Sequence, residues 1–170
     1  MAAKDTEQKP CMPVEPQAEH RWLQKFVGEW VYETEAQMEP GKPLEKFTGT
    51  ETVRSLGGLW ILAEGKGEMP GGGEATMILT LGYDPQKKRY VGTWVGSMMT
   101  HLWLYDGVLD AGGKTLTLDT EGPDMSVEGK MAKYRDVYEF KSDDHRILTS
   151  HTMGADGTWQ VMMKVSYRRK

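Results

Sequence analysis

From Gly28 to the C-terminus, hydrophobic and polar residues alternate in short segments that end at turns containing Gly, Asp or Pro. Alternation with a period of two predicts strands, because successive side chains of a strand point to opposite faces. These segments follow one another without a helical segment between them. The pattern predicts an all-β fold: an antiparallel up-and-down β-barrel of about ten strands, of the calycin or lipocalin-like type.

We expect the strands at residues 29–38, 46–56, 59–68, 74–83, 88–97, 98–106, 114–121, 131–140, 145–153 and 158–168. In the first strand, Trp30, Tyr32 and Thr34 share a face. In the last strand, one face carries Trp159, Val161, Met163, Val165 and Tyr167. The alternation leaves open, strand by strand, which face points into the barrel.

A short amphipathic helix is predicted before the strands, at about residues 16–27. Trp22, Leu23 and Phe26 lie on one face of it, and Gly28 is a typical helix stop. Residues 1–15 are rich in Pro, Lys, Glu and Gln, which predicts a mobile N-terminal tail. We therefore expect a single barrel domain over residues 16–170, with the helix covering one open end.

The composition limits which binding partners and which cellular compartment are expected for the protein. A formal net charge of -4 gives no electrostatic basis for binding nucleic acid or an anionic membrane. Cys11 is the only cysteine, so no intramolecular disulfide can form. Neither a signal peptide nor an apolar run of membrane-spanning length is apparent. A soluble, cytoplasmic protein is expected.

The chain contains 12 methionines and 6 tryptophans, many of them in the strand region. Flexible thioethers and broad indoles form adaptable apolar surfaces, so their abundance favours a cavity for a small hydrophobic molecule. The residues that we expect to line this ligand-binding cavity are Trp30, Trp60, Trp94, His101, Trp103, Arg135, His151 and Met163.

Two histidines are candidates for chemistry. If His101 and His151 both point inward, an imidazole could move a proton near neutral pH, as an enzyme would require. Alternatively, each is a hydrogen-bonded histidine in the core or on the surface. Two histidines without a third ligand at a diagnostic spacing do not predict a metal site.

Charged residues within the strands have two interpretations. Glu51 and Glu64 each share a face with apolar residues, where Arg135 or Lys66 could pair with a carboxylate. Either carboxylate could orient a polar ligand, or it could lie on a wet barrel rim. Arg135 itself could hold an anion, or form a cross-strand ion pair.

Four segments resemble one family: HRWLQKFVGEW (20–30), FTGTETVRSLGG (47–58), LGYDPQKKRYVGTWVGSMMT (81–100) and VMMKVSYRRK (161–170). They are similar to domain-of-unknown-function family 1579, whose members are small lipocalin-like bacterial proteins. The resemblance implies an antiparallel calycin-type barrel and no particular activity. The chain also resembles, more distantly, the nitrobindin-type barrels, which would imply haem held by His151. Of their signature G-x-W-x-G-x-G only Gly28 and Trp30 are present, which argues against haem.

Three hypotheses follow. The first, which we favour, is a barrel that holds a hydrophobic ligand in a cavity lined by Trp and Met. The second is an enzyme that uses His101 or His151 as acid or base. The third is an interaction protein with a solid barrel. A homodimer is compatible with each hypothesis.

Overall fold

The computed structural model of the chain describes residues 13–36 and 41–170. Within these ranges, one short helical segment precedes ten strands. Helix α1 (Ala18–Leu23) continues directly into the 3-10 turn η1 (Gln24–Phe26). The strands are β1 (Gly28–Ala36), β2 (Glu45–Leu56), β3 (Trp60–Glu68), β4 (Glu74–Asp84), β5 (Arg89–Gly96), β6 (Trp103–Leu109), β7 (Thr115–Pro123), β8 (Met131–Ser142), β9 (His145–Met153) and β10 (Trp159–Arg169).

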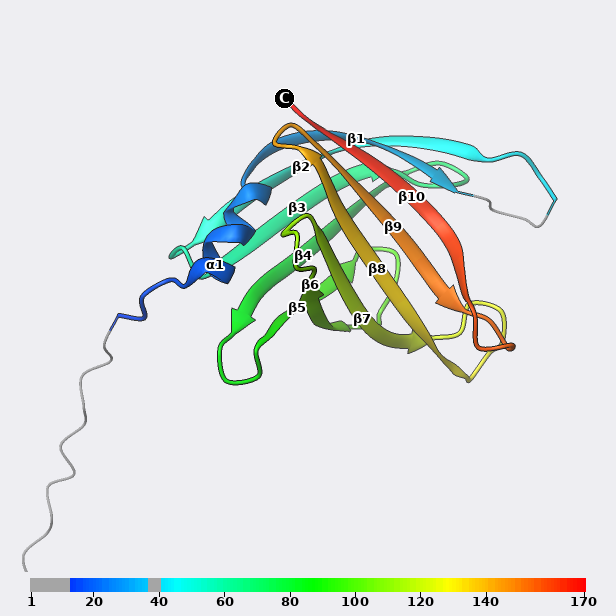
Figure 1. Ribbon diagram of the computed structural model, residues 1–170. Helices are drawn as coiled ribbons and strands as arrows, with labels where there is room; N and C mark the ends of the chain where they lie inside the picture. The colour runs from blue at the N-terminus through cyan, green and yellow to red at the C-terminus, as the bar shows by residue number, and fades with distance from the viewer. Residues whose placement is uncertain (1–12, 37–40) are drawn as a thin grey trace, which may run out of the picture.

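The strands of the described chain form one closed antiparallel barrel (Figure 1). Each strand pairs with its neighbours in sequence, and β10 pairs with β1 to complete the circle. Closure gives every strand two partners and so removes the exposed edges of an open sheet. The predicted all-β barrel with a short N-terminal helix is confirmed.

The largest difference from the predicted strand boundaries is at residues 98–106. The backbone N–H of Met99 donates to the carbonyl oxygen of Gly96, so the chain turns here instead of extending. Strand β6 consequently begins only at Trp103 and continues to Leu109. It pairs with β7 only from Asp106 onward, which leaves its first residues bonded to β5 alone.

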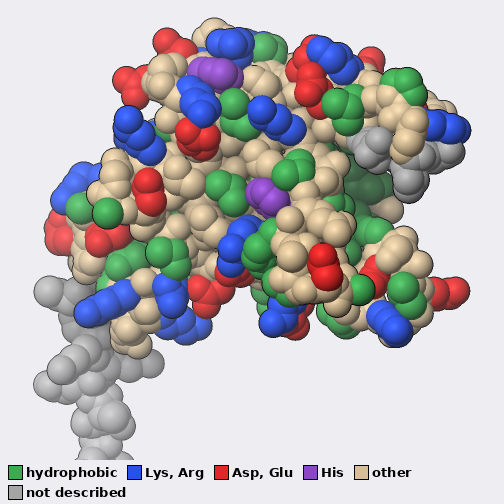
Figure 2. Space-filling view, turned by 45° about the vertical axis from the view of Figure 1, so that its right-hand side comes forward, with side chains coloured by type: hydrophobic (Ala, Val, Ile, Leu, Met, Phe, Trp, Pro, Cys, Tyr) green, Lys and Arg blue, Asp and Glu red, His purple; other side chains and the backbone are tan. Residues whose placement is uncertain are grey.

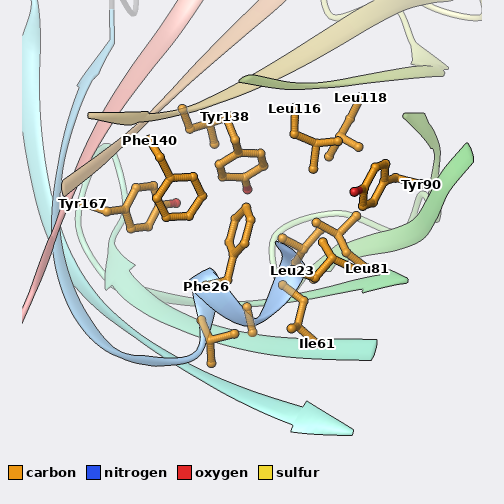
Figure 3. Packing of buried hydrophobic residues seen from close by; sticks show 14 of the residues in the cluster. Leu23, Phe26, Ile61, Leu81, Tyr90, Leu116, Leu118, Tyr138, Phe140 and Tyr167 are labelled. Atoms are coloured by element: carbon orange, nitrogen blue, oxygen red, sulfur yellow. The ribbon is translucent and has the colours of Figure 1, made fainter. Parts of the chain in front are cut away.

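The helical segment fills one end of the barrel (Figure 3). Leu23 and Phe26 are fully buried, and Figure 3 shows them pointing in among the side chains of the strands. The Phe26 ring meets those of Tyr138 and Phe140 edge-on, at centroid distances of 5.3 and 5.0 Å. The Trp22 indole also donates to the carbonyl oxygen of Gly113 at 2.7 Å. These contacts close this end of the barrel.

A bulge in β10 interrupts the alternation of its side chains. The pairing with β9 shifts register between Val161 and Met163. Met163 lines the interior, whereas Val161 is 66% exposed and Trp159 lies beneath Arg135 on the outer face. The extra residue reverses the phase of a period-two pattern. The prediction that these residues share one face is therefore wrong for Trp159 and Val161, which precede the bulge. It is correct for Met163, Val165 and Tyr167, which follow it.

Some predictions fall outside the described residues. These are most of the tail over residues 1–15, with Cys11, and the end of the first predicted strand at Met38. Neither helical segment in the described ranges is long and apolar enough to cross a membrane. Figure 2 shows Lys and Arg interspersed with Asp and Glu over one face of the molecule, without a patch of a single sign.

Candidate ligand cavity

A cavity of about 270 Å³ lies inside the barrel, beyond the residues that pack on the helix. Each strand of the described chain contributes at least one inward side chain to its wall. The methionines that line the cavity are Met77, Met162 and Met163 on strands and Met99 and Met125 in the connections between strands. The aromatic residues are Tyr32, Trp94, Trp103, Tyr105, Tyr134, Tyr138 and Tyr167. The wall is therefore mainly apolar and polarizable, with phenol hydroxyls at intervals.

Glycines that face inward make room for the large rings of this wall. A Cβ atom on Gly122 would overlap the Trp103 ring, and one on Gly67 would overlap the Tyr32 hydroxyl. These strand glycines therefore serve the packing of the aromatic rings. Because these rings lie against the backbone of nearby strands, they leave space toward the centre of the barrel.

Asp136 is the most unusual polar group in the cavity. It lies on β8, and the Tyr105 hydroxyl of β6 donates to its Oδ2 atom at 2.5 Å. The Ser150 hydroxyl is a second hydrogen-bond partner. Burial raises the pKa of the Asp136 carboxyl, and the two hydroxyl groups and the nearby His151 only partly oppose this. Neither partner carries a positive charge to balance the carboxylate.

Replacing Asp136 with asparagine is expected to stabilise the protein at about pH 8. Because burial raises its pKa, the folded protein binds this proton more tightly than the unfolded chain does. Stability therefore falls as pH rises from the ordinary aspartate pKa through the raised one. The variant should therefore be more stable than wild type at about pH 8, and this gain should vanish near pH 4, the ordinary pKa of an aspartate.

Urea unfolding of wild type and variant at both pH values measures this difference. Asp106→Asn, on the exposed outer face of β6, is the matched control and should change stability little at either pH. A variant that is less stable than wild type at about pH 8 would contradict the account. Such a result would mean that the carboxylate stabilises the fold.

A second carboxylate, Glu51 on β2, lies where the cavity meets the closed end of the barrel. The Arg146 guanidinium on β9 donates to its Oε2 atom. Burial raises the pKa of Glu51, against the opposing effect of Arg146. The sequence suggested Arg135 or Lys66 as the partner of such a carboxylate, but the structure pairs Glu51 with Arg146.

Arg146 is only 1% exposed and is enclosed by aromatic rings. Its guanidinium carbon lies 4.1 Å from the Trp30 ring centroid, 4.2 Å from that of Tyr167 and 5.0 Å from that of Phe26. Cation–π attraction therefore supports a charge whose Nε and Nη1 atoms have no hydrogen-bond partner in the described residues. Arg146 lies two residues before the apolar Leu148 and therefore on the same face of the strand. This spacing in the sequence indicated that the Arg146 side chain points inward.

Of the eight residues predicted to line the cavity, three do so: Trp94, Trp103 and Met163. Trp103 donates from its indole nitrogen to the Met99 sulfur at 3.1 Å. Trp30 also points inward, but it is packed in the closed end, where its indole donates to the carbonyl oxygen of Phe26 at 2.8 Å. Its role there is to seal the barrel, beside Arg146.

The other four predicted residues lie on the outside. Trp60 is 39% exposed and rests on Gly82. Arg135 forms a two-pronged ion pair with Asp119 of the neighbouring strand, at 2.6 and 3.0 Å. His151 is the register partner of Arg135, and its Nδ1 atom lies 3.2 Å from the carbonyl oxygen of that residue. Their neighbours Asp136 and Ser150 face inward, so the prediction took the wrong face of β8 and β9.

His101 lies in the connection before β6, where it bridges to β7. Its Nε2 atom is 3.1 Å from the carbonyl oxygen of Glu121, and its ring stands edge-on to Trp103 at 4.9 Å. It lines an outer groove of about 630 Å³, together with Arg135 and Trp159. Thr120 and Tyr134 border both the groove and the cavity, so the barrel wall is thin here, beside the first residues of β6, which pair with β5 but not with β7.

Comparison with known proteins identifies the family. The sequence profile described as "Protein of unknown function (DUF1579)" matches residues 15–169. The chain belongs to this family. The predicted family resemblance is thereby confirmed over nearly the whole barrel and its helix. No curated protein sequence matches the chain significantly.

Solved structures resemble this DUF1579 barrel in fold. The crystal structure of Rv2717c from M. tuberculosis superposes with a TM-score of 0.62 at 8% identity, over 92% of this chain and 99% of that chain. A redesigned β-barrel gives a TM-score of 0.47 at 10% identity, over 88% and 96% of the two chains. The structure of EF1p2_mFAP2b bound to DFHBI gives 0.49 at 11%, over 90% and 100%. At such identities the likeness concerns the fold alone.

The histidine that the haem hypothesis requires does not lie in the cavity of this DUF1579 barrel. His151 points away from the interior, and no histidine is among the described residues that line the cavity. Elsewhere in residues 13–36 and 41–170, no three His, Cys, Asp or Glu side chains are grouped so that they could hold a metal ion. The acid–base hypothesis also placed His101 or His151 in the cavity, and both lie outside it.

Proposed function

We propose that this protein binds a small, predominantly apolar molecule inside the barrel. The observation that supports the proposal most strongly is the cavity itself, because inward side chains from all the described strands leave about 270 Å³ between them. A solid barrel, which the interaction-protein hypothesis requires, would leave no such space. A cytoplasmic location and homodimer formation stay predictions.

The composition of the wall indicates the kind of ligand. Small-molecule pockets measure roughly 300–1,000 Å³, so this cavity suits a compact molecule of one or two rings, or a short chain. Burying about 200 Å² of apolar ligand surface would contribute roughly 5 kcal/mol before ordering costs. Dissociation constants of about 0.2 mM or weaker are therefore expected for simple test compounds. The five methionines allow the wall to adapt to different shapes.

Filling the cavity is expected to abolish binding. Ala63 on β3 is buried and lines the cavity, so the ring in Ala63→Phe would occupy the ligand's space. Titration with 4-phenylbutanol, followed by tryptophan emission, should saturate in wild type because Trp94 and Trp103 are in the wall. The variant should bind at least about tenfold more weakly, equivalent to 1.4 kcal/mol.

Leu62→Phe is the matched control, because it adds the same ring to the outer face of the same strand. It should bind like wild type, and circular dichroism should show that both variants remain folded. If Ala63→Phe unfolds, Leu148→Phe tests the same wall from β9. Binding that does not saturate, or that a folded cavity variant leaves unchanged, would refute an internal site.

A further inference from the structure

The charged side chains that line the cavity are negative. Two carboxylates, Glu51 and Asp136, are among its lining residues, while no lysine, arginine or histidine is among those described. The other polar lining groups are hydroxyls of tyrosine, serine and threonine and the indole N–H groups of Trp94 and Trp103. The described lining residues therefore offer neutral hydrogen-bonding groups and two carboxylates, but no positively charged side chain.

Among the described residues, the buried cation next to this wall, Arg146, is already engaged. Arg146 donates to Glu51, and the rings of Trp30 and Tyr167 lie about its guanidinium at 4.1 and 4.2 Å. It does not line the cavity. A ligand therefore cannot use Arg146 as the anchor for an acidic group, and Arg146 balances Glu51 rather than Asp136.

Asp136 is left with capacity for a further partner. An ionised carboxylate has about four acceptor positions. Tyr105 and Ser150 supply two neutral donors from neighbouring strands, which hold the carboxylate in place within the wall. The remaining acceptor positions can receive a donor from a molecule in the cavity. A positively charged donor would also balance the charge that these hydroxyls leave uncompensated.

We propose that the cavity selects small amines, with an apolar aromatic or alkyl body in the methionine- and tryptophan-lined space and an ammonium group paired with Asp136. This inference rests on the proposed function and names its ligand class. The faces of Trp94, Trp103 and the tyrosines add cation–π attraction in the same space. A carboxylate ligand of the same shape would instead face two carboxylates at low dielectric, so it should be excluded.

Three compounds of matched shape test this inference: 4-phenylbutylamine, 4-phenylbutanol and 4-phenylbutyrate, each titrated by calorimetry at neutral pH. The amine should bind about tenfold or more tightly than the alcohol, as a charge-assisted hydrogen bond predicts. The carboxylate should bind most weakly. In Asp136→Asn, the amine should lose its advantage while the affinity for the alcohol changes by less than about threefold. Asp119→Asn, on the outer face, should leave the wild-type order unchanged.

The outcomes separate this inference from the proposed function. If amine and alcohol bind wild type equally, or the carboxylate binds best, the amine selectivity is refuted and the cavity function stands. If none of the three compounds binds, the proposed function fails and this inference fails with it. An amine preference that survives in Asp136→Asn would refute the role of Asp136. Because the order in wild type decides the first two cases, they do not depend on the folding of a variant.

Discussion

Replacing Arg146 with methionine is expected to destabilise the protein by about 3–5 kcal/mol. The variant would keep the Glu51 carboxylate buried and remove its partner, and an unpaired buried charge is among the most costly defects in a fold. It would also remove the guanidinium from between the Trp30 and Tyr167 rings. Urea unfolding at neutral pH measures the loss.

The double variant Glu51→Leu/Arg146→Met separates charge from packing. With both charges replaced by apolar groups of similar size, the stability should recover to within about 2 kcal/mol of wild type, or exceed it. If the double variant is as unstable as Arg146→Met alone, Arg146 acts through packing and not through Glu51.

Acid should partly rescue the single variant Arg146→Met. Without Arg146, nothing opposes the effect of burial, so the pKa of Glu51 should rise further above its ordinary value. The folded variant then binds a proton that the unfolded chain releases near pH 4, and its stability should increase as pH falls toward that value. Wild type should show a weaker increase of the same sign, since Arg146 opposes the effect of burial in it.

Phe26→Ala is expected to cost about 3–5 kcal/mol, the range for truncating a fully buried phenylalanine. The Phe26 ring packs against Tyr138, Phe140 and the Arg146 guanidinium, so its loss would leave a void at the closed end of the barrel. Thermal and urea unfolding both report this change. The helix should detach more readily as well, which hydrogen exchange of its amides would show.

Leu104→Ala is the matched control for Phe26→Ala. Leu104 lies on the outer face of β6 and is 62% exposed, so its truncation should change stability by no more than about 0.5 kcal/mol. A loss below about 1 kcal/mol in Phe26→Ala would contradict the sealing role of the helix. It would mean that the strands alone supply the stability of this end.

The barrel could be predicted from the sequence because a period of two is a local property. Trp30 and Tyr32 alternate with Glu29, Val31 and Glu33, and each strand repeats a pattern with this period before a turn. Which face of each strand points into the barrel could not be predicted as well as the strands themselves. On β8 and β9, the inward and outward sets both mix polar and apolar residues, so Arg135 and His151 were as plausible inside as Asp136 and Ser150.

The cavity depends on properties that no single strand reveals. Its volume is the space left between side chains from strands far apart in sequence, such as Ala63 and Leu148. The Glu51–Arg146 pair joins residues 95 positions apart, and the sequence around either residue does not indicate its partner. The bulge near Met162 likewise depends on the pairing of β10 with β9. The sequence indicated the inward direction of Arg146 only through its shared strand face with the apolar Leu148.

The most direct test of an internal binding site is the NMR spectrum of the protein with ¹³C-labelled methionine methyl groups, recorded during titration with 4-phenylbutanol. The account predicts saturable shifts at the cavity methionines, Met77, Met99, Met125, Met162 and Met163. The methyl signals of Met131, which is exposed, and of Met153, which lines the outer groove, should not shift. Shifts at Met153 without shifts at Met77 and Met163 would place the ligand outside the barrel and contradict the account.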